Sequence, residues 1–101
     1  MTVLKNQVEY DLWDAVSPIL KGVVSEADFR SCAEDAECGY PAGGVSGLLW
    51  TLYEDGTPVP ESAIQVIESF EQRLYDYNTD WFGVVGAMVD SVKKNGTDSF
   101  K

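Results

Sequence analysis

The sequence predicts an all-α fold, a compact bundle of four to five short antiparallel helices. Apolar residues recur at three- and four-residue steps in five successive segments, and they almost never alternate with the period of two that marks a strand. Breaks rich in glycine, proline and asparagine separate these segments. The 101 residues are 45% hydrophobic and 24% charged, which is the size and composition of one globular domain.

The first predicted helix covers residues 3–20, with one apolar face. That face consists of Leu4, Val8, Leu12, Val16 and Ile19 or Leu20. Pro18 has no amide hydrogen to bond the carbonyl of residue 14. We therefore expect this helix to kink or end near Ser17, with Gly22 as its C-terminal cap.

The second and third predicted helices are separated by Gly39-Tyr40-Pro41. Ser25 can cap a second helix of about ten residues, whose thin apolar face is Phe29, Cys32 and Ala36. The third helix is expected over 42–54, where apolar residues fall at i, i+3, i+4 and i+7: Val45, Leu48, Leu49 and Leu52. Glycines at 43, 44 and 47 weaken its start but allow close packing against a neighbour.

The fourth and fifth predicted helices complete a single domain over residues 1–96. Asp55-Gly56-Thr57-Pro58 ends the third helix, and Pro60 opens a fourth over about 60–77. The apolar face of the fourth is Ala63, Ile67, Phe70, Leu74 and Tyr77, widened by Ile64 and Val66. That of the fifth is Trp81, Val85, Met88 and Val92, with Phe82, Val84 and Val89 beside it. Lys93 and Lys94 suit the last turn, Asn95-Gly96 ends it, and residues 97–101 are expected to form a frayed tail. The tryptophans are expected in the core.

The charge balance points to a basic protein partner. Acids outnumber bases 17 to 7, which gives a net charge of -10. Binding to nucleic-acid phosphates or to an anionic membrane surface needs clustered lysine and arginine, so both are disfavoured. The chain has no histidine, which removes the Ser-His and Cys-His nucleophile pairs and the commonest general base. We expect no catalytic residues, no metal and no cofactor.

The candidate chemical motifs favour structural interpretations. Asp76, Asn78 and Asp80 occupy positions 1, 3 and 5 of a calcium loop, but positions 6 and 12 hold Trp81 and Ala87 instead of glycine and glutamate. The glycine-rich segment 43–47 lacks the lysine of a phosphate-binding loop. No apolar run reaches the length of a signal peptide or membrane span, so we expect a cytoplasmic protein. Its two cysteines, Cys32 and Cys38, are then expected as free, partly buried thiols.

A long acidic stretch supplies the candidate binding site. Residues 31–72 contain no lysine or arginine, although they hold eight acids. This stretch is either a solvated surface that keeps the protein soluble or a contact face for a basic partner. The acids beside the two breaks around the third helix, together with a neighbouring tyrosine, form the predicted interface: Glu34, Asp35, Glu37, Tyr53, Glu54 and Asp55.

Residues 38–74 combine a leucine spacing, an acidic turn and a proline-led helix. The pattern comprises Gly44-Val45, Leu48-Leu49, Leu52-Tyr53-Glu54 and Gly56-Thr57-Pro58-Val59-Pro60, followed by an amphipathic helix. It resembles the Maf-type immunity proteins of bacterial toxin systems, which are small, acidic, mostly helical proteins encoded beside a toxin. The resemblance implies a bacterial protein that neutralises a cognate toxin by covering its basic active site or substrate groove.

Three functions fit these observations. The first is an immunity-type inhibitor of a basic toxin, such as a nuclease. The second is a phage-type inhibitor that mimics the charge of DNA and blocks a host nuclease or defence complex, which requires carboxylates in rows with phosphate-like spacing. The third is a small regulatory or structural domain whose acidity serves only solubility, and it predicts no tight basic partner.

Overall fold

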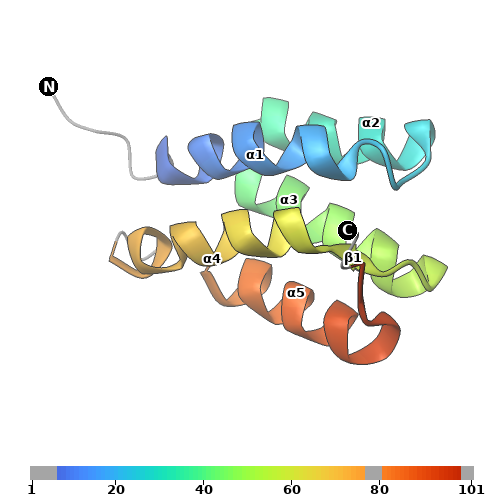
Figure 1. Cartoon of the computed structure of the whole chain (residues 1–101). Helices are drawn as coiled ribbons and strands as arrows, with labels where there is room; N and C mark the ends of the chain where they lie inside the picture. The colour runs from blue at the N-terminus through green and yellow to red at the C-terminus, as the bar shows by residue number, and fades with distance from the viewer. Residues whose placement is uncertain (1–6, 77–80, 99–101) are drawn as a thin grey trace, which may run out of the picture.

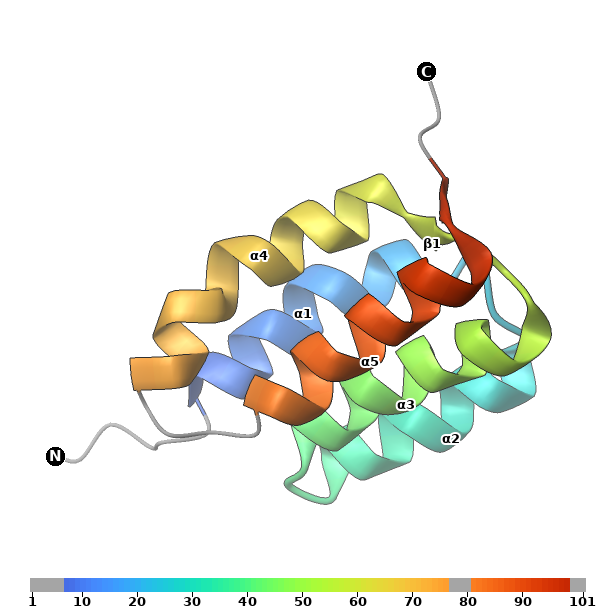
Figure 2. The same cartoon turned by 90° about the horizontal axis from the view of Figure 1, so that it is seen from below.

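The computed structural model describes residues 7–76 and 81–98, and it confirms the all-α bundle. Its five helices are α1 (Gln7–Leu20), α2 (Glu26–Glu37), α3 (Pro41–Asp55), α4 (Glu61–Asp76) and α5 (Trp81–Asn95). Successive helices run in opposite directions (Figure 1). Helix α3 packs against α1, α2 and α5, while α4 packs against α1 and α5. Helix α3 is therefore central in the bundle, and the view from below in Figure 2 shows it between α2 and α5.

Helix α1 continues through Pro18 and ends at Leu20. Of the two outcomes predicted near Ser17, a kink or an end, the end was therefore wrong. The amide of Lys21 donates to the Ser17 carbonyl at 2.9 Å, so i to i−4 hydrogen bonding resumes after the proline. Pro18 is exposed, so solvent can reach the backbone where the proline removes a donor. Gly22 is not a left-handed cap; the glycines with positive φ are Gly39, Gly56 and Gly96.

Helices α2 and α3 approach closely at glycines, as predicted. Ser25 caps α2 by accepting a hydrogen bond from the amide of Asp28 at 3.1 Å. A methyl group on Gly44 would lie 2.8 Å from the backbone oxygen of Cys32, and one on Gly47 would lie 2.9 Å from its sulfur. Because neither contact leaves room for a Cβ, the glycines set the distance between the two helices.

The core consists mainly of the predicted aliphatic residues, but Trp50 departs from the prediction. Completely buried large side chains include Leu12, Val16, Leu20, Val45, Leu48, Leu49, Leu52, Ile67 and Val84. Trp13 packs against this core and stacks on Phe29, with ring centroids 5.9 Å apart. Trp50 is 41% exposed, so its predicted core position was wrong. The side chain of Trp81 lies outside the described part of the chain.

Helix α5 is rotated relative to its predicted apolar face. Among its residues 83–95, those buried are Val84, Ala87, Met88 and Ser91, whereas Val85 and Val92 are only partly buried. The buried stripe includes a serine because the Ser91 hydroxyl donates a hydrogen bond of 2.9 Å to the Leu49 carbonyl. That bond offsets the free-energy cost of removing the hydroxyl from water. A pattern of apolar residues cannot predict burial of this kind.

The chain after α5 pairs with the loop after α3. Gly96, at φ 82°, ends α5, and β2 (Thr97–Asp98) then runs parallel to β1 (Val59–Pro60), with Val59 opposite Thr97. The amide of Val59 donates to the Gly96 carbonyl at 3.2 Å. The frayed tail predicted from residue 97 is therefore wrong for Thr97 and Asp98. Residues 99–101 lie outside the described chain.

Candidate protein-binding surface

The six residues of the predicted interface fall into two groups. Glu34, Asp35 and Glu37 lie in the last turns of α2 and form what we call the α2 acidic cluster. Tyr53, Glu54 and Asp55 lie at the end of α3. All five carboxylates are exposed, and Tyr53 is partly buried.

The two groups lie at opposite ends of the α2–α3 pair. Helix α2 ends where α3 begins, since only residues 38–40 separate them. From Pro41 to Tyr53, α3 advances 12 residues, or about 18 Å at 1.5 Å per residue. The structure therefore brings Glu54 and Asp55 together with Tyr53, but it does not join them to the α2 acidic cluster in one patch.

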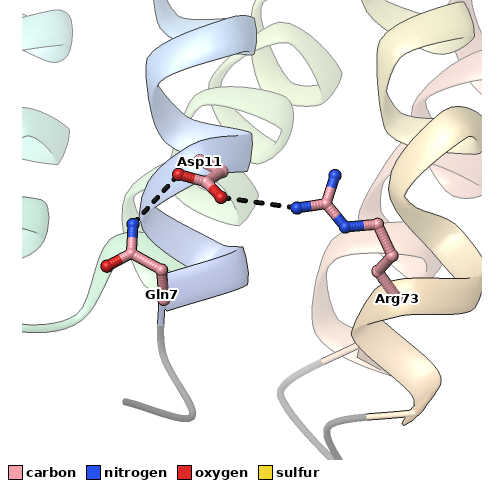
Figure 3. Close-up of polar contacts among 3 residues, drawn as sticks. All are labelled: Gln7, Asp11 and Arg73. Carbon is pink, nitrogen blue, oxygen red and sulfur yellow. Dashed lines mark hydrogen bonds and ion pairs between the residues drawn. The ribbon is translucent and has the colours of Figure 1, made fainter. Parts of the chain in front are cut away.

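None of these five carboxylates forms an ion pair with a lysine or arginine of the described residues. Among residues 7–76 and 81–98, the ion pairs are Glu26–Arg30 at 3.9 Å and Asp11–Arg73 at 3.3 Å. In the second pair, Gln7 also donates to Asp11 at 3.0 Å, which holds that carboxylate between α1 and α4 (Figure 3). The charges of the α2 acidic cluster and of Glu54 and Asp55 are therefore available to a partner.

An exposed aromatic residue adjoins the acidic end of α3. Trp50 and Tyr53 meet edge to face, with ring centroids 5.2 Å apart and an interplanar angle of 74°. Trp50, Tyr53 and Glu54 are spaced i, i+3 and i+4, so their side chains are neighbours on one helix surface. We call these three residues the Trp50 surface. The sequence indicates this outward position, because Trp50 follows the core residue Val45 by five positions and so lies about 140° from it around the helix.

Helix α5 covers part of the end of α3. The Lys94 ammonium lies 4.5 Å from the centroid of the Tyr53 ring and donates to the Tyr53 carbonyl. The Asn95 amide donates to the carbonyls of Leu52, at 2.9 Å, and Tyr53, at 3.3 Å. The Leu52 carbonyl also accepts from the backbone amides of Gly56 and Thr57, whereas the Tyr53 carbonyl lies in the last turn, where intrahelical donors run out. Lys94 is thus a cation already bound at this end.

A shallow groove separates α4 from α5. It has a volume of about 260 Å³ and is lined by Ile64, Glu68, Met88, Val89, Val92, Lys93 and Thr97. Its lining is mainly apolar, with one carboxylate, Glu68, and one ammonium, Lys93. Two carboxylates that could divide the roles of acid and base are therefore not brought together in this groove.

The two cysteines are free thiols in different surroundings. Cys38 is exposed, whereas Cys32 is buried against α3. Burial raises the pKa of the Cys32 thiol, and the nearby Asp35 and Asp28 carboxylates raise it further. Because the thiolate is the reactive form, Cys32 is a poor nucleophile at neutral pH.

Metal-binding side chains do not cluster in the described part of the chain. Within residues 7–76 and 81–98, no group of three or more cysteine, aspartate and glutamate side chains could hold a metal ion. Residues 77–80, which include Asn78 and Asp80 of the calcium-like spacing, lie outside that part. None of the described helices combines the length and apolarity needed to cross a membrane.

Comparison with known proteins found no matching family model, no matching curated protein and no matching solved structure.

Proposed function

We propose that this chain is a non-catalytic, acidic protein-binding inhibitor of the immunity type, which neutralises a basic cognate toxin in the bacterial cytoplasm. The observation that carries the proposal is a set of exposed carboxylates that contribute no ion pair to the described part of the fold. Glu34, Asp35, Glu37, Glu54 and Asp55 are all exposed, and no ion pair engages them within the described residues.

The net negative charge lowers the stability of the folded state, and a binding role explains why the protein keeps that charge. At a net charge of -10, mutual repulsion opposes the compact state, while the same field speeds encounter with a positively charged protein. The core is built mainly from apolar side chains, and the side-chain hydrogen bonds to the backbone of α2 and α3 come from the Ser25 and Ser91 hydroxyls and the Asn95 amide. The exposed acids are therefore free to serve recognition, a role that also agrees with the resemblance of residues 38–74 to Maf-type immunity proteins.

The test begins by capturing the partner with the full chain as bait in lysate of the source cell. Washes at about 0.05 M and about 0.5 M salt separate loose charge attraction from a packed interface, because salt screens exposed charges. The retained protein is then purified, and its toxic or enzymatic activity is measured with increasing amounts of the chain. We expect one basic protein to survive the high-salt wash and to lose its activity at a one-to-one ratio.

The control bait carries Glu34→Gln, Asp35→Asn, Glu37→Gln, Glu54→Gln and Asp55→Asn, which remove five charges and keep the side-chain shapes. It should retain its helical circular dichroism and capture less of the partner. If both baits retain only proteins that leave at high salt, or if the retained protein keeps its full activity, the inhibitor proposal is wrong and the acidity serves solubility.

A further inference from the structure

We propose that the Trp50 surface docks an arginine side chain of the partner. The guanidinium stacks on the exposed indole of Trp50 and donates hydrogen bonds to the Glu54 carboxylate. This inference rests on the proposed function, and it specifies which surface binds and which basic side chain is recognised.

The geometry of α3 supports simultaneous contact with both groups. Trp50 and Glu54 are separated by one helical turn, which places side chains four residues apart about 5–6 Å from each other. A guanidinium stacked on the indole is therefore within reach of the carboxylate. The edge-to-face contact with Tyr53 supports the indole from the side. A supported ring loses less conformational freedom when a ligand stacks on it.

Lys94 shows that this end of α3 binds cations. Its ammonium combines the face of the Tyr53 ring with a carbonyl of the last helical turn, where the helix dipole is negative. Within the described residues, lysine or arginine side chains lie over the rings of Phe29, Phe70 and Tyr53, but none lies over that of Trp50. Lys94 of the same chain thus covers the Tyr53 ring, and the neighbouring Trp50 indole is the ring on which a cation of the partner can stack.

The charge and shape of the surface select arginine over lysine. Glu54 and Asp55 provide two exposed carboxylates that no described cation pairs with. A planar guanidinium can stack on an indole and still direct N–H groups at a carboxylate in its own plane. A lysine ammonium is a strongly hydrated point charge, so it gains less from the exposed ring. Val89 in the α4–α5 groove is also exposed, but its aliphatic side chain offers no ring face on which a guanidinium could stack.

The experiment titrates the full chain with two synthetic nine-residue peptides that carry either three arginines or three lysines on a glycine and serine background. Binding is followed at about 0.05 M salt through the indole N–H resonance of Trp50, which is assigned by its loss in Trp50→Phe. We expect the arginine peptide to shift this resonance and to bind roughly 2- to 5-fold more tightly than the lysine peptide, as for an exposed cation–π contact of about 0.5–1 kcal/mol.

Two variants that each remove one charge locate the site. Glu54→Gln should weaken binding of the arginine peptide several-fold and reduce the shift of the Trp50 resonance. Asp14→Asn, which removes one exposed carboxylate of α1 outside the predicted interface, is the control and should leave that shift in place. Trp50→Ala should abolish the preference for arginine over lysine. Circular dichroism confirms that each variant retains its helices.

Three results would overturn the inference. They are equal affinity for the two peptides, a Trp50 resonance that neither peptide moves, and equal weakening by Asp14→Asn and Glu54→Gln. Each of them leaves the inhibitor proposal standing if the captured partner still loses its activity, because the partner then binds elsewhere on the acidic surface. Failure of the capture experiment is a separate result, so the two proposals can fail independently.

Discussion

The Ser91 hydroxyl on α5 donates a hydrogen bond to the Leu49 carbonyl on α3, and both residues are completely buried. One turn further along both helices, the Asn95 amide bonds the Leu52 carbonyl. Two polar side chains of α5 thus follow the backbone of α3 at matching intervals. Because directional bonds tolerate less sliding than apolar contacts, these two contacts fix the register of α5 on α3.

Removing the Ser91 hydroxyl should destabilise the fold. Ser91→Ala deletes one buried hydrogen bond, so we expect the free energy of unfolding to fall by about 1 kcal/mol. Ser69→Ala is the matched control, because Ser69 makes an exposed bond to Val66 within its own helix, and it should change stability by less than about 0.5 kcal/mol. Urea unfolding monitored by circular dichroism measures both. Equal midpoints for the two variants would contradict the structural role of Ser91.

Two glycine-to-alanine substitutions should have opposite effects. Gly44→Ala places a methyl group against the backbone of Cys32, and the resulting shift of α2 should cost about 1–3 kcal/mol. Gly86 lies within α5, and a methyl group added there would have nothing within 4 Å, so Gly86→Ala should gain roughly 0.5–1 kcal/mol from helix propensity. Thermal unfolding should show a lower midpoint for the first variant and a higher one for the second. A shift of the same sign in both would contradict the close packing of α2 on α3.

The two thiols should differ in reactivity. Cys38 is exposed, whereas Cys32 is buried and its pKa is raised by burial. At neutral pH, a chromogenic disulfide reagent should therefore modify one thiol quickly, and the second only after denaturant is added. The fast phase should disappear in Cys38→Ala and persist in Cys32→Ala. Loss of the fast phase in Cys32→Ala would reverse the assignment.

The raised pKa of Cys32 also predicts a loss of stability at alkaline pH. An unfolded thiol ionises around its ordinary pKa of 9.0, whereas the folded thiol still holds its proton there. The stability from this group is therefore fully present below about pH 9 and is lost as the pH rises towards the raised, folded value. The difference in unfolding free energy between the natural chain and Cys32→Ala should be constant from pH 7 to about pH 8 and shrink above about pH 9. Parallel curves for the natural chain and Cys32→Ala would contradict the assignment.

Charge reversal at the end of α3 should slow association with the captured partner. Glu54→Lys combined with Asp55→Lys changes the local charge by four and suits the negative end of the helix dipole, so the fold should be retained. We expect a roughly tenfold lower association rate at low salt, measured by surface plasmon resonance. The control, Glu34→Lys with Asp35→Lys, makes the same change in the α2 acidic cluster and should slow association less. Unchanged kinetics in the first variant would remove Glu54 and Asp55 from the interface.

The sequence was sufficient for the helices because their signals are local. The stripe from Val45 to Leu52, the Ser25 cap and the glycine break at 56 each act within a few residues. The rotation of α5 was missed because Ser91 is buried by a hydrogen bond to a residue 42 positions away. The pairing of β1 with β2 was missed because two residues are too short to show a period.

The candidate site was predicted in its chemistry but not in its geometry. All five acids are exposed as expected, yet the two breaks that they flank are the opposite ends of α3. The sequence prediction grouped these acids because each lies beside a break, although the length of α3 separates the two breaks. Trp50 was omitted because tryptophan was treated as a core residue by type, although its angle from the apolar stripe indicated an outward position.

The central position of α3 has a consequence for biosynthesis. Its partners lie on both sides of it in the sequence, with α1 and α2 before it and α5 after it. Until α5 has left the ribosome, the first three helices can pack together, but the side of α3 that receives Ser91 and Asn95 has no cover. Nascent chains at this stage present an apolar surface on which chaperones can act. Premature termination before α5 should therefore yield an aggregation-prone fragment instead of a smaller stable bundle.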